Sequence, residues 1–331
     1  MPVMDAMDRK LLMRLQTAFP LVPRPFAALG AVLGLTEDEV LARLARLKEE
    51  GVVRRFGAFF DPARLGYYST LCALAVPPER LEDAAALING YEGVTHNYLR
   101  EHAYNLWFTL IAASRAQARQ TLEQIQERTG LVGLLELPAV RRYKIRVIFD
   151  LDGSGDRPAE AIAAGETLGE RSAPEFSPRE KRLLHALQAD LPLEPAPFAR
   201  MAASASLTEE EVLAGLRELL AKGVVRRFGP ALRHRQAGFA ANAMVVWQVP
   251  QEKVPAAAAL LAASPHVTHC YERVRRPGWP YNLYTMVHGA DRDFCRRVVA
   301  ALAQAGGIGE YAMLFSSAEL KKSTMRYTFA T

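Results

Sequence analysis

The chain of 331 residues is poor in cysteine, in aromatic side chains and in long apolar runs. Its cysteines, Cys72, Cys270 and Cys295, are isolated and odd in number, so they predict neither a disulfide framework nor a zinc site. No run of about 18 uncharged apolar residues occurs, which argues against a membrane-spanning helix. The first residues are charged rather than apolar, so no secretory signal is expected. Together these absences predict a cytoplasmic protein without a membrane partner.

An excess of one charge is also lacking. The chain carries 41 Lys and Arg against 36 Asp and Glu, a net charge of +5. This mild excess permits an anionic partner and does not require a nucleic acid. Several signature motifs are missing too: a G-x-G-x-x-G loop, a P-loop, a G-x-S-x-G elbow and an H-E-x-x-H helix. Nothing therefore indicates the nucleotide, serine-hydrolase or zinc-protease chemistry that these motifs support.

The sequence does contain one module twice. Leu35–Gly57 and Leu207–Gly229 are identical at 16 of 23 positions, at an offset of 172. Downstream, VTHNYLREHAYNLWF (Val94–Phe108) matches VTHCYERVRRPGWPYNLY (Val267–Tyr284). The intervening segment 151–177 is rich in Gly, Pro, Ala and acidic residues, which is typical of a linker. The length and the repeat together predict a tandem duplication.

Each copy begins with the pattern of a winged helix-turn-helix. Apolar spacing predicts a first helix over Asp8–Ala18 and, in the second copy, over Pro178–Ala189. Thr36 and Thr208 are each followed three residues later by glutamate, a capping box that opens a second helix. The strand-like VVRRFG that follows is expected to form a small β-wing. The predicted winged helix-turn-helix domains are 1–62 and 178–234.

The remainder of each copy reads as an α+β domain. The order of apolar patterns is βαββαβ, which is the ferredoxin-like arrangement. The predicted elements are strands Tyr67–Val76, Val94–Arg100, Tyr104–Ala112, Ala139–Asp150 and Asn242–Val249, and helices Pro78–Gly90, Gln117–Thr129 and Glu252–Ala263. The predicted ferredoxin-like domains are 63–150 and 235–331, related by a pseudo-two-fold axis.

A helix-turn-helix usually binds DNA through the N-terminal turn of its recognition helix. Here that turn is acidic in both copies, over Thr36–Glu39 and Thr208–Glu211. Carboxylates at this place oppose the phosphates of a duplex. DNA is therefore not the expected partner, and a DNA-binding regulator remains the alternative function.

The string T-H-x-Y-x-R is the most informative feature of both copies. In a strand, alternate side chains share a face, so His96, Tyr98 and Arg100 are expected to point the same way. If the extended path continues, His102 and Tyr104 join them. The second copy keeps the pattern as His269, Tyr271, Arg273 and Tyr281 and inserts Arg275-Arg276-Pro277-Gly278-Trp279-Pro280. The alternative is a solvated polar face, but such faces are more often built from Lys, Glu and Thr.

Imidazole, phenol and guanidinium groups together suit a polyanionic ligand. Arginine binds carboxylates through its planar fork, and tyrosine donates hydrogen bonds. Histidine can serve as an acid, a base or a haem-iron ligand. The face lacks carboxylates, which disfavours two-carboxylate glycosidase chemistry.

These strings carry a family resemblance. The winged helix followed by βαββαβ resembles the Lrp/AsnC regulators. GVVRRFG, VTHNYLR-x-H-x-YNLWFT and VTHCYER…PYNLY are similar to the sirohaem decarboxylases, Lrp-like proteins of the haem d1 and alternative haem pathways. In that family the two subunits are often separate chains, and this chain resembles the fused type, with a D-like first half and an L-like second half.

The resemblance implies a carboxy-lyase that removes CO2 from the C12 and C18 acetates of sirohaem and gives didecarboxysirohaem. Sirohaem carries eight carboxylates, which fits an arginine-rich site. It implies no cofactor beyond the iron tetrapyrrole substrate and no intrinsic metal. Sirohaem is the expected partner, with other haem d1 pathway enzymes and a homo-oligomer as further partners. The alternatives are an Lrp/AsnC-type DNA-binding regulator and a sirohaem-binding sensor or carrier.

Residue roles follow from the resemblance as hypotheses. The predicted catalytic residues are His96, His102, His269, Tyr98 and Tyr271; one of the three histidines is the proton donor, and one is alternatively a ligand of the sirohaem iron. The predicted substrate-binding residues are Arg54, Arg55, Arg100, Tyr104, Arg226, Arg227, Arg273, Arg275, Arg276 and Tyr281. Because the second copy has no counterpart of His102, we expect two unequal half-sites. Residues predicted to be solvated surface are Arg141, Arg142, Lys144, Lys321, Lys322 and Arg326, and His234 and His288 are predicted to be structural.

Overall fold

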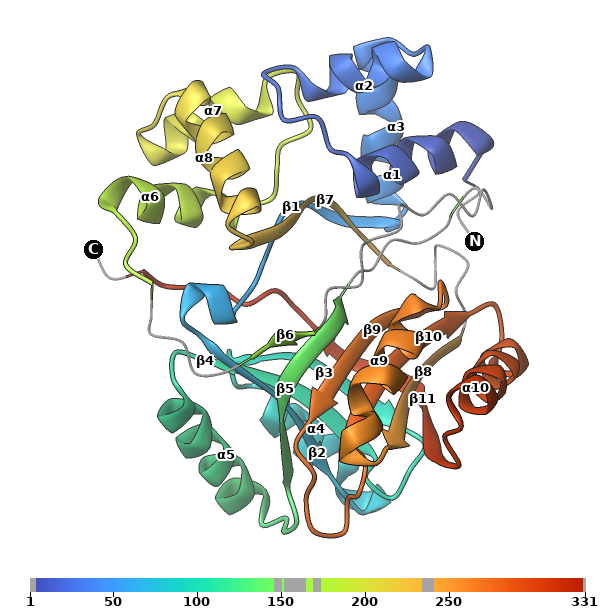
Figure 1. Cartoon of the computed structure of the whole chain (residues 1–331). Coiled ribbons are helices and arrows are strands. Elements are labelled where there is room, and N and C mark those ends of the chain that lie inside the picture. The colour runs from blue at the N-terminus through green and yellow to red at the C-terminus, as the bar shows by residue number, and fades with distance from the viewer. Residues whose placement is uncertain (1–3, 146–150, 152–164, 169–173, 234–240, 330–331) are drawn as a thin grey trace.

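The computed structural model describes residues 4–145, 151, 165–168, 174–233 and 241–329 of the chain. It has two layers, a helical layer above and a ring of β-strands below, with a two-stranded ribbon between them (Figure 1). Both copies of the duplicated sequence contribute to each layer. The predicted fold class is confirmed: each copy is a helix-turn-helix unit followed by βαββαβ.

Six helices form the upper layer, three from each copy. They are α1 (Ala6–Thr17), α2 (Pro25–Leu33), α3 (Glu37–Glu49), α6 (Pro178–Ala186), α7 (Pro197–Ala205) and α8 (Glu209–Ala221). Capping boxes open α3 at Thr36 and α8 at Thr208, as the sequence predicts. Asp5 and Ser177 open α1 and α6 in the same way. These side chains satisfy backbone N–H groups that have no partner within the helix.

The expected β-wings take a different form. Each copy supplies a single strand, β1 (Val53–Phe60) or β7 (Val225–Leu232), and the two strands pair with each other in antiparallel fashion. A lone strand leaves its N–H and C=O groups unpaired, and the pseudo-two-fold axis brings the equivalent strand within reach. Gly57 pairs directly with Gly229 on this axis. Both have positive φ, and a Cβ on Gly229 would lie 2.6 Å from the Leu15 carbonyl oxygen, so glycine is required.

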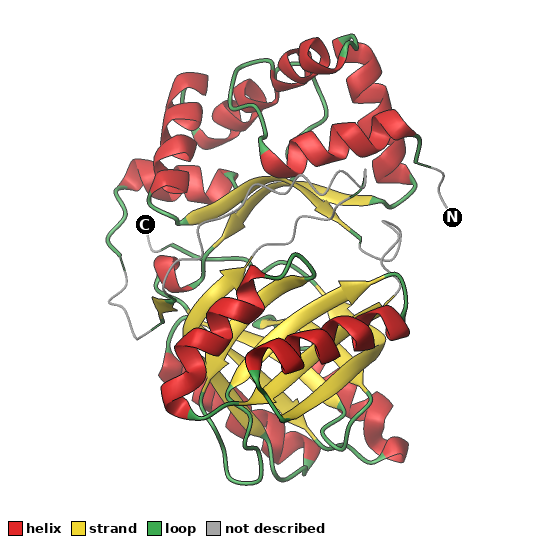
Figure 2. Cartoon of the chain, turned by 45° about the vertical axis from the view of Figure 1, so that its right-hand side comes forward, coloured by secondary structure: helices red, strands yellow, loops and turns green. Residues whose placement is uncertain are grey.

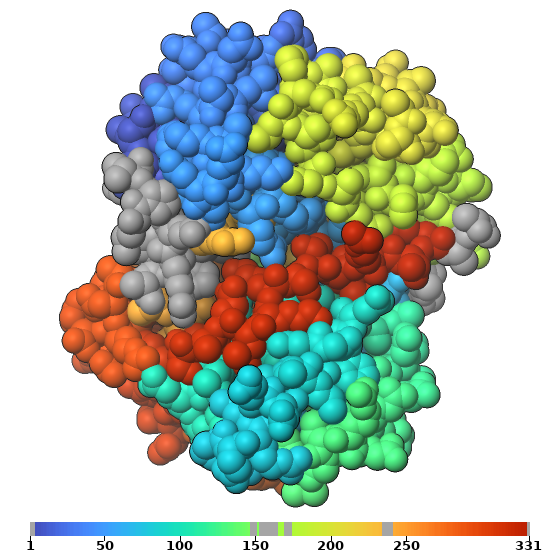
Figure 3. All heavy atoms as spheres, turned by 180° about the vertical axis from the view of Figure 1, so that it is seen from behind, coloured from blue at the N-terminus to red at the C-terminus, as the bar shows by residue number. Residues whose placement is uncertain are grey.

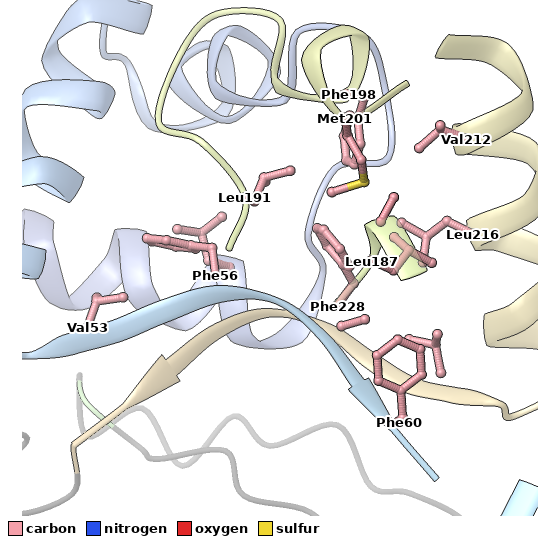
Figure 4. Close-up of a cluster of buried hydrophobic side chains, with 14 of the residues drawn as sticks. Val53, Phe56, Phe60, Leu187, Leu191, Phe198, Met201, Val212, Leu216 and Phe228 are labelled. Atoms are coloured by element: carbon pink, nitrogen blue, oxygen red, sulfur yellow. The ribbon is translucent and has the colours of Figure 1, made fainter. Parts of the chain in front are cut away.

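The two helix-turn-helix units share one hydrophobic core. Figure 4 shows Phe228 from β7 near Phe198 from α7, and Phe56 from β1 near Leu191 of the second copy. Phe56 and Phe198 are fully buried. Since side chains of both copies fill this core, neither helical unit buries its apolar face alone.

The lower layer contains the two ferredoxin-like units. The first consists of β2 (Tyr68–Leu74), α4 (Leu81–Asn89), β3 (Val94–Arg100), β4 (Leu106–Ala112), α5 (Arg115–Thr129) and β5 (Leu135–Ile145). The second consists of β8 (Ala241–Gln248), α9 (Val254–Ala263), β9 (Val267–Arg273), β10 (Leu283–Gly289), α10 (Arg292–Gly306) and β11 (Glu310–Lys322). Short 3-10 turns lie at Ala63–Leu65, Pro78–Arg80 and Gln251–Lys253.

The eight long strands of the lower layer close into a ring. Each copy forms a four-stranded sheet, in the order β5-β2-β4-β3 or β11-β8-β10-β9. Two seams join the sheets, β3 with β11 and β9 with β5, so the edge strand of each copy pairs with the last strand of the other. Figure 2 shows helices packed on the outer side of the strands. The inside of the ring is filled by an apolar core that includes Trp107, Met244 and Leu314.

Two further segments tie the layers together. Within the predicted linker 151–177, Glu166–Thr167 forms the short strand β6, which pairs with β5; much of the remaining linker lies outside the described residues. The C-terminal segment runs across the waist of the molecule between the two layers (Figure 3). There Gln188 of the helical layer exchanges hydrogen bonds with the Tyr327 backbone, and the Tyr67 hydroxyl bonds to Thr328.

Candidate functional site

A cavity of about 1090 Å³ lies between the β1/β7 ribbon and the open upper end of the strand ring. The ribbon supplies Arg54, Arg55, Arg226 and Arg227 to its lining, and the C-terminal segment contributes Lys322, Ser323, Thr324, Met325 and Tyr327. The cavity is large enough for a ligand much bigger than a typical metabolite, since small-molecule pockets span roughly 300–1,000 Å³. Both copies line this one space, so the two half-sites are not separate pockets.

The T-H-x-Y-x-R strands line the cavity, and their three functional side chains share one face as predicted. On β3, His96, Tyr98 and Arg100 line it, while Asn97 bonds to Asn89 of α4 on the opposite face. On β9, the corresponding lining residues are His269, Tyr271 and Arg273. Period-two alternation therefore places imidazole, phenol and guanidinium on one face in each copy.

The two histidines are held in the same manner. The Nδ1 atom of His96 lies 3.0 Å from Thr95 Oγ1, and that of His269 lies 3.0 Å from Thr268 Oγ1. Each imidazole stacks on the tyrosine two residues later, with ring centroids 6.4 Å apart in both copies. Among the described residues, neither Nε2 atom has a protein partner. Each ring is thus fixed through Nδ1, and Nε2 remains available to a ligand.

Both histidines are neutral at neutral pH. Burial, with a smaller contribution from nearby Lys322 and Arg54, lowers the pKa of His96 to about 4. Burial and the charge of Arg226 lower the pKa of His269 to about 3. Desolvation and neighbouring cations both disfavour an imidazolium ion. Both pKa values therefore lie below the ordinary histidine value of about 6.5.

Tyr98 and Tyr271 remain protonated phenols. Burial raises the pKa of both side chains above the ordinary tyrosine value. The Tyr98 hydroxyl already donates to Glu319 Oε2 at 3.3 Å. A buried phenol that keeps its proton is a hydrogen-bond donor to an anionic ligand.

Arg100 and Arg273 carry charge without a carboxylate partner. Nη1 of Arg100 donates to the Leu314 carbonyl at 3.0 Å, and Nη1 of Arg273 donates to the Leu137 carbonyl at 2.7 Å. The Nε atom of each is buried and unbonded, and no acidic side chain pairs with either guanidinium in the described part of the chain. Burial lowers the pKa of Arg100 to about 10, so the group stays charged at neutral pH. Buried charges are costly unless they are paired, which points to an anionic ligand at this place.

The cavity concentrates positive charge. Nine basic side chains and one carboxylate, Asp61, line it within the described ranges. The basic residues are Arg54, Arg55, Arg100, Arg115, Arg142, Arg226, Arg227, Arg273 and Lys322. The chain as a whole has a net charge of only +5, so the rest of the molecule is acidic on balance. A polyanion is therefore drawn to this space rather than to the surface in general.

Five predicted site residues lie away from the cavity: His102, Tyr104, Arg275, Arg276 and Tyr281. The expectation that His102 and Tyr104 continue the polar face is wrong, because β3 ends at Arg100 and the chain bends back, with the Arg100 N–H bonded to the Asn105 carbonyl. His102, Tyr104 and Tyr281 surround Trp279, with ring centroids 5.3, 5.4 and 4.9 Å from it.

The insertion of the second copy anchors this aromatic group. Trp279 is 2% exposed and belongs to the core inside the strand ring. Arg275 bonds to the Val249 carbonyl, and Nε of Arg276 donates to the Glu136 carbonyl at 2.8 Å. Both arginines are therefore occupied by backbone, and the structure gives them a packing role in place of the predicted ligand contact.

Several residues assigned to the surface or to structure do line the cavity. Arg142 on β5, Lys322 on β11 and His288 on β10 are among them. Arg142 and Lys322 lie on strands that pair with a strand of the other copy, so alternation within one copy did not reveal them. By contrast, Lys144 and Lys321 donate to backbone carbonyls at the ends of α9 and α4. His234 lies outside the described residues.

The described residues contain no cluster of three or more His, Cys, Asp or Glu side chains that could hold a metal ion. A search of the same residues finds no helix long and apolar enough to span a membrane.

Comparison with known proteins identifies the family. A model for the "AsnC-like ligand binding domain" matches residues 64–144 and 236–321, and one for the "Siroheme decarboxylase NirDL-like HTH domain" matches residues 8–54 and 180–226. The NirDL subunit of siroheme decarboxylase from Paracoccus denitrificans is 40% identical over 90% of this chain and 89% of its own length. The chain belongs to the sirohaem decarboxylase family.

Two further members extend the match over the whole fold. The sirohaem decarboxylase of Hydrogenobacter thermophilus is 34% identical over 96% of this chain and 94% of its own length. A crystal structure of the sirohaem decarboxylase NirDL with an iron-uroporphyrin III analogue superimposes with a TM-score of 0.71, at 30% identity, over 98% of this chain and 94% of that one.

Proposed function

We propose that this sirohaem decarboxylase removes the C12 and C18 acetate carboxyls of sirohaem as CO2 and yields 12,18-didecarboxysirohaem in haem d1 biosynthesis. One observation carries the proposal: a single large cavity, lined by nine basic residues and one carboxylate, contains two arginines without acidic partners. Sirohaem has eight carboxylates, so its charge is the complement of this lining. Arginine forks bind such groups in a bidentate way.

The reaction needs no oxidant or reductant. The bond between the methylene carbon and the carboxylate carbon breaks, CO2 leaves, and the electron pair stays on the methylene carbon next to the pyrrole. That carbon then takes one proton and becomes a methyl group. The protein must therefore hold the acetate and supply one proton for each CO2 that is lost.

His96 and His269 are the proposed proton donors. Free imidazoles in this cavity are neutral, because burial and cations depress their pKa values. A bound polycarboxylate reverses that electrostatic balance and raises both pKa values towards the range that suits general-acid work. The same neutral imidazole, fixed through Nδ1 with Nε2 available, also suits an iron ligand, which is the alternative role.

Tyr98, Tyr271 and the arginines are proposed to hold the carboxylates. Arg100 and Arg273 would bind carboxylates on the side of the strand ring. On the side of the ribbon, carboxylates would be bound by Arg54, Arg55, Arg226 and Arg227. Their positions around one cavity support this assignment.

The test is anaerobic incubation of the protein with sirohaem, followed by mass spectrometry for successive losses of CO2. We expect His96→Ala and His269→Ala each to lower turnover by about 100-fold or more, the range of a lost general acid, while a spectroscopic titration shows that sirohaem still binds. His185→Ala on the exposed face of α6 is the control and keeps wild-type turnover.

Other outcomes distinguish the alternatives. An altered absorption spectrum of the bound tetrapyrrole after substitution of one histidine would identify that residue as an iron ligand. Binding without any loss of CO2 would make the protein a sensor or carrier. Salt-sensitive binding of a DNA duplex by the ligand-free protein would support a regulator, although acidic residues open both α3 and α8.

A further inference from the structure

The cavity has pseudo-two-fold symmetry, whereas its proposed substrate does not. The β3/β11 seam and the β9/β5 seam are equivalent, and each places a T-H-x-Y-x-R strand against the last strand of the other copy. A tetrapyrrole with unlike side chains could enter such a space in two orientations. Something in the protein must favour one of them if the two acetates are to react in a defined order. The argument rests on the proposed function.

The two seams have the same register of paired residues, and their β-bulges fall at equivalent positions. Lys321 lies opposite Asn97 in one seam, and Lys144 lies opposite Cys270 in the other. Both lysines donate to carbonyls at a helix end, Lys321 to α4 and Lys144 to α9. The facing strands can therefore be compared position by position, and this lysine pair is conserved in role between the copies.

The positions that face the functional side chains differ. Opposite the tyrosines, Glu319 faces Tyr98 in one seam and Arg142 faces Tyr271 in the other. Opposite the histidines, Lys322 faces His96 whereas Ile145 faces His269. Among the cations of the facing strands, the one that lines the cavity thus lies beside the histidine in the first half-site and beside the tyrosine in the second.

The offset between these cations is large on the scale of the substrate. Histidine and tyrosine are two residues apart, which is about 7 Å along a strand. Acetate and propionate side chains differ in reach by a single carbon. A cation displaced by several ångströms therefore meets a different carboxylate of the macrocycle in each half-site.

Arg142 is fixed in place. Its Nη1 lies 2.5 Å from Oδ2 of Asp61, which is 2% exposed, and its Nη2 bonds to Glu166 of β6. Glu166 also binds Arg64 at 2.9 Å. The Nζ atom of Lys322 lies 3.7 Å from Oε2 of Glu319, and the backbone carbonyl of Lys322 accepts a hydrogen bond from Nη1 of Arg54. Both cations hold defined positions, as an orienting device requires. Arg142 is paired with two carboxylates and Lys322 with one, so Lys322 is the more available of the two to a carboxylate of the substrate.

We propose that the offset between Lys322 and Arg142 fixes the orientation of the tetrapyrrole in the cavity and thereby the order in which its two acetates lose CO2. Lys322 and Arg142 are specificity-determining residues in this scheme. His96 and His269 each act on the acetate that this orientation brings to them.

The experiment exchanges the cation between the half-sites without changing the charge of the cavity. The double variant Lys322→Ile/Ile145→Lys is incubated anaerobically with sirohaem and quenched after about one turnover. The monodecarboxylated intermediate is isolated, and proton NMR locates its new methyl group at C12 or C18. We expect the wild type to favour one isomer by about tenfold or more, and the double variant to shift the isomer ratio towards the other by at least tenfold.

The control is Arg141→Ile, which removes a cation from β5 next to Arg142 but outside the cavity lining; its isomer ratio should equal that of the wild type. Circular dichroism and thermal melting check the fold. If the double variant does not fold, Lys322→Met alone is used and is expected to shift the ratio in the same direction.

The outcomes distinguish a failure of the orientation inference from a failure of the proposed function. An equal mixture of isomers from the wild type, or an unchanged ratio in a folded and active variant, overturns the orientation inference and leaves the decarboxylase intact. Failure of the wild type to release any CO2 overturns the proposed function, and the inference with it.

Discussion

The two half-sites combine a shared framework with different surroundings. His96, Tyr98 and Arg100 repeat as His269, Tyr271 and Arg273, with the same threonine contact and the same ring stacking. Around them, Lys322 is replaced by Ile145 and Glu319 by Arg142. The groups proposed to touch the reacting acetate are thus kept in both copies, while the charges that would select a side of the macrocycle have diverged.

A second difference lies at the other end of the strand ring. Only the second copy carries the insertion with Trp279, and that ring packs against His102 and Tyr104 of the first copy. Nε1 of Trp279 donates to the Tyr284 hydroxyl at 2.6 Å, and the Arg273 guanidinium lies 5.5 Å from the centre of the Tyr284 ring. The insertion therefore supports the second half-site through Tyr284, and Trp279 also packs against Trp107 of the first copy, with ring centroids 5.5 Å apart.

The largest effect is expected from removing this support. Trp279→Ala leaves a cavity among buried aromatic rings and should lower the free energy of unfolding by about 3–5 kcal/mol, measured by urea denaturation. Trp279→Phe, which keeps most of the volume, is the control and should cost clearly less. An effect of Trp279→Ala below about 1 kcal/mol would mean that the ring is not an essential part of the core.

The next largest effect is expected at the two buried arginines that both half-sites share. Arg100→Met and Arg273→Met should each weaken the binding of sirohaem by about 30-fold or more, because a buried charge-assisted contact is lost. Without ligand, the melting temperature should hold or rise, because a desolvated charge has been removed. Spectroscopic titration and thermal melting measure both quantities. If the two variants lose binding affinity by factors that differ by more than tenfold, Arg100 and Arg273 are not equivalent in binding.

The smallest expected effect is the pH dependence of stability that the two buried histidines cause. The pKa values of His96 and His269, about 4 and about 3, lie below the unfolded value near 6.5, so the unfolded chain binds more protons on acidification. The free energy of unfolding should therefore fall as the pH drops from 6.5 to 5.5, by about 1 kcal/mol per histidine.

Urea denaturation across this pH range, in the wild type and in His96→Gln and His269→Gln, measures the contribution of each histidine. Each substitution should flatten the profile by a similar amount. A profile that keeps its slope in both variants would assign the acid sensitivity to other groups.

Local sequence patterns account for much of this fold and site. Alternation along β3 correctly placed His96, Tyr98 and Arg100 on one face, and capping boxes located α3 and α8. These features depend on side chains that are near in sequence, where strand and helix periodicity govern orientation.

The features that sequence reasoning missed depend on contacts between the copies. Arg142 and Lys322 reach the cavity because the last strand of each copy pairs with the edge strand of the other. The ribbon forms from β1 and β7, which lie far apart in the chain. No periodicity within one copy encodes such a register. His102 was misplaced for a local reason: β3 ends at Arg100 as predicted, but the chain beyond it bends back instead of remaining extended.

The closed ring has a consequence for how this duplication can evolve. A second copy of a sequence normally offers redundancy, since one copy can preserve the ancestral task while the other drifts. Here each histidine belongs to one copy and the strand facing it belongs to the other, so neither copy is a spare. A change in either half reaches both reaction centres, and the two halves are constrained to diverge together.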